Sequence, residues 1–212
     1  MKKFTLLMMT AALFVFAGCK NDPAEGKHRA VAEEAAEVKE LTETSVQYAF
    51  SNDGSEIEFV GAKVTGKHDG EFKVFSGTID LINDDITQSR VNVTIQMDSM
   101  VADEERLTGH LKSDDFFDVE NHPTSEFVST AIVAKAGEGG TTHEVTGNLT
   151  IRGVTKSITF PAKIEIEDDE IEAEAEFAIN RKDFNITYPG MPDDLIKDQF
   201  LLKLALEAKK KS

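Results

Sequence analysis

The feature that most constrains the fold is a strict alternation of acidic and apolar residues between Glu170 and Ile179. The segment reads Glu-Ile-Glu-Ala-Glu-Ala-Glu-Phe-Ala-Ile. Successive side chains of a β-strand point to opposite faces of its sheet, so this order places the acids on one face and the apolar groups on the other. The segment therefore predicts a strand with one face in water and one face against a core.

The same period of two recurs through most of the chain after Thr44. Further alternating stretches lie at 56–60, 71–74, 78–82, 91–97, 126–133, 145–151, 157–166 and 200–206. Turn-forming residues separate them, at 52–54, 69–70, 83–85, 137–140, 152–153 and 168–169. Short strands at this spacing predict either a closed barrel or a β-sandwich, in a single domain over residues 44–212.

One stretch, residues 103–112, breaks the alternation and places Leu107 and Leu111 four residues apart. This spacing puts both side chains on one face of a helix, so a short helical insertion is predicted. Ser113, followed by two aspartates, has the chemistry of an N-cap and predicts a second helical turn. Such an insertion either closes one end of a barrel or crosses over and packs on the core.

The N-terminal residues predict export and a lipid anchor. Two lysines precede an apolar run over residues 4–17, and Ala17-Gly18-Cys19 ends the run as a lipoprotein signal does. The run is shorter than the roughly 20 helical residues that span a bilayer core. We therefore predict a signal peptide over residues 1–18, lipidation of Cys19 and attachment to a bacterial membrane, at the periplasmic face or the cell surface. An ordinary secretory signal followed by a leftover cysteine is the alternative.

Residues 19–43 contain mainly Ala, Glu and Lys and hardly any large apolar side chain, so we expect the lipidated cysteine to be followed by a flexible tether.

The whole chain has 23 Lys and Arg against 39 Asp and Glu, a net charge of −16. So acidic a protein repels nucleic-acid phosphates and anionic headgroups, which excludes nucleic acid as a partner and leaves acyl chains as the membrane attachment. We leave a homodimer open beside the monomer.

Catalytic and cofactor motifs are not found in the sequence. It has no Gly-x-Ser-x-Gly elbow, no His-Glu-x-x-His and no glycine-rich phosphate loop, and its one cysteine is the predicted anchor. His110 and His122 flank the helical insertion and could share a metal, but capping or hydrogen bonding at a barrel rim explains them better. We expect no enzyme activity, no cofactor and no metal.

The inward positions of the predicted strands mix bulky apolar residues with small ones. Phe59, Phe127 and Leu204 are large, whereas Gly147 and Ala175 are small. An eight-stranded barrel either fills its interior with side chains or holds one small ligand, and small inward residues favour the second outcome. A packed core remains the alternative at this point.

Several blocks of the sequence resemble the YceI-like, polyisoprenoid-binding family. They are His110-Leu-Lys-Ser-Asp-Asp-Phe-Phe-Asp-Val with Pro123-Thr-Ser-Glu-Phe-Val-Ser-Thr, then Val145 to Pro161, then Phe177-Ala-Ile-Asn-Arg-Lys-Asp-Phe-Asn-Ile, and more weakly 61–68 with 75–79. Together they cover nearly all of residues 54–208 in the order of the family. Asn185 stands where the family usually has Gly, and the loop 188–192 does not align.

The resemblance implies an all-β fold, a single antiparallel lipocalin-like barrel of about eight strands with a short helical insertion. It implies non-enzymatic binding, storage or transport of a long-chain apolar lipid, a polyisoprenoid or similar amphiphile, in the cell envelope. The expected cavity lining is Ile57, Phe59, Phe72, Val93, Ile95, Leu111, Phe116, Phe117, Phe127, Leu149, Phe160, Ala173, Ala175, Phe177, Phe184, Leu202 and Leu204.

The cations nearest the matching blocks are candidates for a lipid head group, namely Arg181, His110, Lys112 and Arg152, with Arg181 preferred. A salt bridge at the barrel rim explains Arg181 about as well. Two other functions stay open. One is a hydrolase or isomerase acting on such a lipid, with His110 and an aspartate as the acid and base. The other is a filled barrel that serves as a structural or protein-interaction module.

Overall fold

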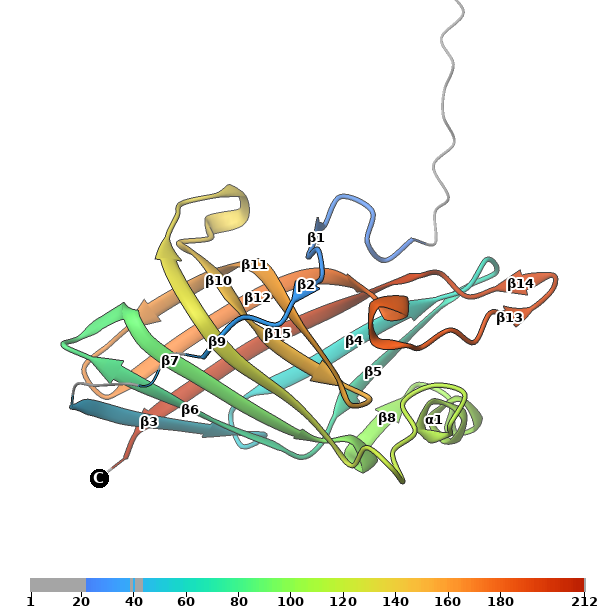
Figure 1. The fold of residues 1–212 in the computed structure, drawn as a ribbon, viewed down its shortest axis with the longest axis horizontal. Coiled ribbons are helices and arrows are strands. Elements are labelled where there is room, and N and C mark those ends of the chain that lie inside the picture. Colours follow the sequence, from blue (N-terminus) through green and yellow to red (C-terminus); the bar gives the residue numbers. More distant parts are fainter. Residues whose placement is uncertain (1–21, 39, 41–43, 212) are drawn as a thin grey trace, which may run out of the picture.

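The computed structural model describes residues 22–38, 40 and 44–211, and Figure 1 shows them as an elongated barrel. Eight antiparallel strands close the barrel, which confirms the predicted fold class. Five of them are continuous, and they are β9 (Thr124–Ala134), β10 (His143–Ile151), β11 (Val154–Ile166), β12 (Glu170–Asn180) and β15 (Gln199–Lys210). The strand predicted from the alternation at 170–179 is β12.

The other three strands of the barrel are long and interrupted. Their segments are β3 (Ser45–Ser51) with β4 (Glu56–Ala62), β5 (Lys67–Phe72) with β6 (Phe75–Ile82), and β7 (Asp85–Gln96) with β8 (Met100–Ala102), the last two joined by a 3-10 turn at Met97–Ser99. Each interruption lets the strand bend. The halves of the first two strands keep the same neighbours, and β3 and β4 both pair with β15, for example. In the third strand, β7 pairs with β6 and β9, whereas β8 pairs with β5.

The strands follow one another around the barrel in chain order, and β15 closes the ring by pairing with β12 on one side and with β3 and β4 on the other. The register brings apolar inward residues side by side. Phe177 of β12 lies opposite Leu202 of β15, which lies opposite Phe59 of β4. Tight turns join neighbouring strands, and Asn83, Asp84 and Arg152 adopt the positive φ that such turns require.

The predicted helix is present as α1 (Glu105–Lys112), but the second helical turn is not. Ser113 ends α1, because its hydroxyl donates to the carbonyl of His110 at 2.7 Å, and residues 114–117 form turns. The amides of Asp118 and Val119 donate back to the carbonyls of Ser113 and Lys112. The chain therefore folds over the end of α1 instead of beginning another helix, and the N-cap prediction is wrong.

Residues 22–38, here called the strap, differ from the expected flexible tether. They contain β1 (His28–Arg29), which pairs with β12, and β2 (Glu33–Glu34), which pairs with β11. Figure 1 shows the strap, in blue, lying along the barrel. Ala24 and Ala30 are 2% and 6% exposed, so small side chains let the strap approach the wall closely. Cys19 and the predicted signal peptide lie outside the described residues.

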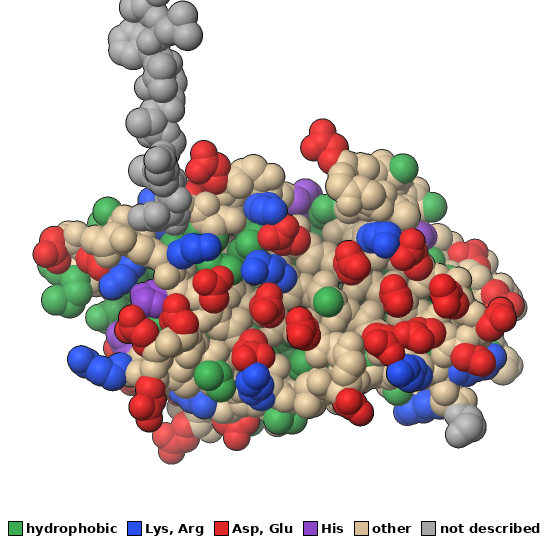
Figure 2. Space-filling model, turned by 180° about the vertical axis from the view of Figure 1, so that it is seen from behind, with side chains coloured by type: hydrophobic (Ala, Val, Ile, Leu, Met, Phe, Trp, Pro, Cys, Tyr) green, Lys and Arg blue, Asp and Glu red, His purple; other side chains and the backbone are tan. Residues whose placement is uncertain are grey.

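No helix within the described residues is both long and apolar enough to cross a membrane. Acidic side chains are spread over the barrel face shown in Figure 2, with fewer Lys and Arg among them. On this face the molecule presents no broad basic patch.

Candidate ligand cavity

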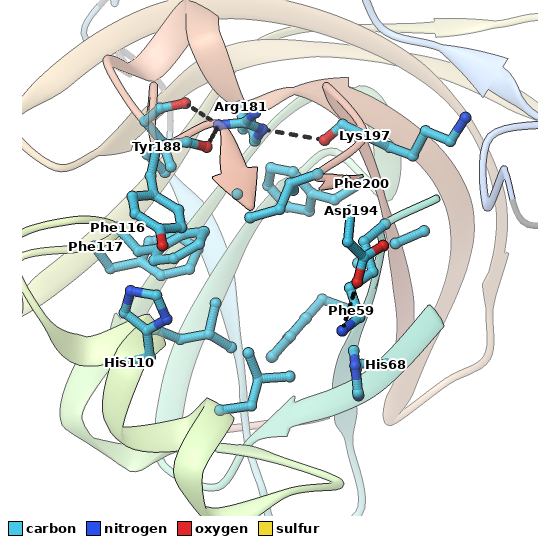
Figure 3. Close-up of a pocket in the computed structure, with 18 of the residues that line it drawn as sticks. Phe59, His68, His110, Phe116, Phe117, Arg181, Tyr188, Asp194, Lys197 and Phe200 are labelled. Carbon is cyan, nitrogen blue, oxygen red and sulfur yellow. Dashed lines mark hydrogen bonds and ion pairs between the residues drawn. The ribbon is translucent and has the colours of Figure 1, made fainter. Parts of the chain in front are cut away.

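A cavity of about 560 Å³ opens at the end of the barrel where α1 lies, and we call it the mouth cavity. Figure 3 looks into it and shows side chains around a central space. Its walls come from β4, from α1 and the turn after it, and from residues 181–200. The main apolar contributors are Phe59, Leu107, Leu111, Phe116, Phe117, Ile186, Tyr188, Ile196 and Phe200.

A second cavity of about 110 Å³ lies deeper in the barrel, and we call it the inner cavity. Its lining is almost wholly apolar and comes from β4, β7, β9, β10, β11, β12 and β15. Leu202, Leu204 and Leu206 line it, yet these three side chains are only partly buried. They keep accessible surface because they face a void, so the barrel is not filled by its own side chains.

Aromatic rings separate the two cavities, which have no lining residue in common. Phe160 and Phe177 stack across the interior, with ring centroids 4.1 Å apart and planes 8° from parallel, and both face the inner cavity. Phe59 and Phe200 face the mouth cavity. A long chain that occupied both cavities would have to displace some of these rings.

Two glycines let aromatic rings lie flat against the barrel wall. A Cβ atom at Gly70 would come within 2.2 Å of the ring of Phe59, and one at Gly147 within 2.3 Å of the ring of Phe127. Atoms cannot approach so closely, so each ring occupies the space where a side chain would otherwise stand. The rings therefore cover the wall and leave the centre of the barrel open.

All but two of the residues predicted to line a cavity do so. Those on the mouth cavity are Phe59, Leu111, Phe116 and Phe117, and those on the inner cavity are Ile57, Val93, Ile95, Phe127, Leu149, Phe160, Ala173, Ala175, Phe177, Leu202 and Leu204. Phe72 and Phe184 pack in the core instead and line neither cavity. Contact of these residues with a ligand stays a prediction.

Arg181, the preferred head-group cation, lines the mouth cavity but is engaged by the protein itself. Its Nη1 donates to the carbonyls of Ile186 and Tyr188, both at 2.8 Å, and its Nε donates to that of Lys197 at 3.1 Å. Burial lowers the pKa of Arg181 from its ordinary value, and the charge of Asp198 opposes that shift. Arg181 is 4% exposed and holds residues 186–198 against the barrel, so the structure gives it a structural role.

The three other head-group candidates lie in different surroundings. His110 lines the mouth cavity, and its Nε2 is 3.0 Å from Oδ2 of Asp115. Lys112 donates to the carbonyl of Asp98 and Arg152 to those of Asp114 and Asn185, and neither lines the mouth cavity. Of these three candidates, His110 is thus the one that lines the mouth cavity.

The mouth cavity also contains polar groups that the sequence did not indicate. Asp194 accepts hydrogen bonds from Thr65 and forms an ion pair with Lys63 at 3.0 Å, and these partners, Lys63 foremost, lower the pKa of Asp194. Oε1 of Gln199 is buried and has no hydrogen-bond partner in the protein. Thr65 and Asp194 are 129 residues apart in the chain, so no local pattern could have joined them.

The fold and its cavities define a class, a hollow antiparallel barrel with an apolar interior and a polar rim. Residues 48–208 match the family model of the YceI-like domain, and the chain belongs to this family. Protein YceI of Salmonella arizonae is 36% identical over 124 residues, which are 56% of this chain and 63% of that protein. The aligned part thus spans less than two thirds of the relative.

Solved structures share the barrel. Burkholderia cenocepacia BcnA is 25% identical and superimposes with a TM-score of 0.64 over 74% of this chain and 98% of its own. A polyisoprenoid-binding domain from Saccharophagus degradans is 14% identical, with a TM-score of 0.62 over 79% of this chain and 99% of its own. The Campylobacter jejuni YCEI protein is 21% identical, with a TM-score of 0.54 over the full length of both.

Proposed function

We propose that the protein binds a long-chain apolar lipid, a polyisoprenoid or similar amphiphile, inside the barrel and carries or stores it without changing it. The observation that carries this proposal is the pair of apolar cavities along the barrel interior. Each CH₂ group that moves from water into such a cavity contributes about 0.8 kcal/mol, so a long chain gains affinity along its whole length. The structural relative from Saccharophagus degradans is a polyisoprenoid-binding domain, which supports the same class of ligand.

The lining of the mouth cavity carries groups that can bind a hydroxyl or amide head group. The cations Lys63, Arg106, Arg181 and Lys197 stand there beside the acids Glu104 and Asp194, and the buried cation, Arg181, already donates to backbone carbonyls. Gln199 Oε1 is an acceptor without a donor, which a hydroxyl or amide N–H of a ligand would satisfy.

We also propose that the protein acts in the cell envelope, attached to a membrane by acyl chains on Cys19. The support is the sequence Ala17-Gly18-Cys19 after an apolar run. Two or more acyl chains suffice for stable attachment. Metabolic labelling with a palmitate analogue tests this, and the label must disappear in Cys19→Ser.

Native mass spectrometry of the chain from residue 20 onward, which keeps the strap, tests lipid binding. The protein purified from bacteria should carry an adduct of lipid mass that organic solvent releases unchanged. Delipidated protein should take up geranylgeraniol in equal molar amount. Failure to bind any prenyl alcohol, with the barrel folded by circular dichroism, would rule the proposal out.

One observation keeps an enzyme as the second candidate. His110 and Asp115 form a hydrogen-bonded pair beside the mouth cavity, and the imidazole also contacts the rings of Phe116 and Tyr188 at 4.9 and 5.0 Å between centroids. A positioned imidazole and carboxylate can serve general acid–base chemistry. Chemical change of a bound prenyl lipid that is lost in His110→Ala but kept in Lys112→Ala would favour this candidate.

A further inference from the structure

The barrel wall is incomplete between two neighbouring strands. β11 and β12 pair directly only from Lys163 opposite Glu174 to Ile166 opposite Ile171. Toward the mouth, residues 155–161 of β11 and 175–180 of β12 continue as strands but do not pair with each other. We call this divergence the fork. Backbone polar groups along both of its edges need other partners.

Pro161 lies where the fork begins and explains why direct pairing stops. The carbonyl of Ala162 accepts from the amide of Thr142, on the β10 side of β11. Polar groups of successive residues in a strand point to opposite sides, so those of Pro161 face β12. Proline has no N–H to donate there, and it interrupts the ladder.

The strap occupies the fork. His28 and Arg29 pair with Phe177 and Ala178 of β12, and the amide of Ala30 donates to the carbonyl of Ala178 at 2.8 Å. On the other edge, Glu33 and Glu34 pair with Ser157 and Lys156 of β11. The strap runs parallel to β12 and antiparallel to β11, as a strand between them must.

The strap is also linked to both edges by side chains. Nε2 of His28 lies 3.0 Å from the carbonyl of Thr159 on β11, and Lys27 pairs with Glu176 on β12. Farther on, the side chain of Asn148 forms two hydrogen bonds with the backbone of Ala36, at 2.9 and 2.7 Å. The strap thus closes the fork from outside and is held at its far end by one asparagine.

Behind the strap, the stacked rings of Phe160 and Phe177 span the fork from inside, one ring from each edge strand. Outside, a surface groove of about 930 Å³ reaches the fork, and Gly26, Lys27, His28, Pro161 and Ala175 are among its lining residues. The groove and the inner cavity have Glu174, Ala175 and Leu204 in common. The inner cavity shares no lining residue with the mouth cavity. It is therefore nearer to the outside at the fork than at the mouth.

Few interactions hold the strap. Its two strands have two residues each, whereas β10 and β11 pair over nine. Val31, at 72% exposed, has its side chain in solvent, and the buried strap side chains are alanines, which contribute little apolar area. Segments with so few buried contacts open at a lower free energy than the barrel that carries them.

We propose that the fork is a side entrance to the inner cavity and that displacement of the strap opens it to a lipid chain. This inference rests on the proposed function. When the strap leaves, the outer layer is removed, and rotation of Phe160 and Phe177 joins the groove to the inner cavity. An apolar chain then enters sideways between β11 and β12, and the strap returns to satisfy both strand edges.

The test is a disulfide that locks the strap in the full chain carrying Cys19→Ser. Glu33→Cys with Ser157→Cys places two thiols at directly opposed positions of β2 and β11. The matched control, Thr78→Cys with Asn92→Cys, links the opposed residues of two strands that stay paired, β6 and β7. Each protein is mixed, oxidised or reduced, with phosphatidylcholine vesicles that contain geranylgeraniol, and protein-bound lipid is measured over time.

We expect the oxidised strap lock to load geranylgeraniol about tenfold or more slowly than its reduced form, with the same final occupancy, because closure changes the rate and not the site. The control disulfide should leave the rate unchanged. Asn148→Ala, which frees the strap at Ala36, should load faster than the parent. If the disulfide does not form, the loading rate of Asn148→Ala still tests the side entrance.

Equal loading rates for the oxidised and reduced lock would overturn the side entrance while leaving lipid binding intact. Slower loading in Met191→Asp, a change at an exposed apolar residue on the rim of the mouth cavity, together with equal rates for the lock, would assign entry to the mouth. No uptake by any variant would instead contradict the proposed function.

Discussion

Individual residues decide whether the barrel interior is hollow. Ala175 lines the inner cavity and the groove at the fork, and its small side chain leaves room there. Phe127 also lines the inner cavity and lies flat over Gly147. Large side chains at such positions would give a filled core of the same fold. Arg181 has a structural role instead. Its N–H groups donate to carbonyls of the chain, and these hydrogen bonds shape the mouth cavity.

Replacing Ala175 with Phe should weaken geranylgeraniol binding about tenfold or more while the barrel stays folded, because the ring occupies existing space. The comparison is Ala205→Phe, the same enlargement on the exposed side of β15. Titration monitored by native mass spectrometry gives the affinity, and thermal unfolding reports the fold. Unfolding of the Ala175 variant would show that the interior was already packed.

Arg181→Met should lower the free energy of unfolding by about 2–4 kcal/mol, since one buried and two partly buried carbonyls lose their donor while the volume is kept. Urea titration monitored by circular dichroism measures the change. Arg152→Met removes two hydrogen bonds at an exposed position and should cost less than about 1 kcal/mol. Equal losses for the two variants would argue against a special structural role for Arg181.

Among the elements, those with strong side-chain patterns were predictable and the strap was not. β12 alternates from Glu170 to Phe177, and α1 carries Leu107 and Leu111 at helical spacing. The strap is attached by backbone hydrogen bonds and by small alanine side chains. Neither kind of contact requires an alternation of apolar residues, so the sequence shows no strand pattern there. The sequence indicated Arg181 as a candidate but not its hydrogen-bond partners, and it did not indicate Gln199, because the contacts of both depend on loop geometry.

Native-state hydrogen exchange should separate the strap from the barrel. The amide of Ala30 should exchange at least about a hundredfold faster than amides shared by β10 and β11, because opening the strap breaks few contacts. The exchange should become faster still in Asn148→Ala, with the β10 and β11 amides unaffected. Equal protection of both sets would mean that the strap opens only when the whole barrel unfolds.

The molecule as a whole carries a large negative charge, −16, spread over a surface with few cations. Like charges repel one another more in the compact state than in the unfolded chain, and salt screens this repulsion within about 10 Å at 0.1 M. We therefore expect the melting temperature to rise between 10 and 200 mM sodium chloride.

Thermal scans at several salt concentrations measure this effect. Glu172→Lys places a cation opposite Glu207 on β15, so its melting temperature should depend less on salt. A melting temperature independent of salt in the parent protein would show that the acids are spaced widely enough not to interact.

The ring order has a consequence for how the protein is made. β15 is the last barrel strand in the sequence and pairs with β12, the strand before it in the barrel, and with β3 and β4, the first. Its contacts with β3 and β4 therefore join distant parts of the sequence. Until residues 199–210 emerge, β12 and β3 remain open edges that can pair with other chains. A chain that ends before β15 cannot close the barrel. We therefore expect chaperones to hold the growing chain unfolded until its synthesis ends.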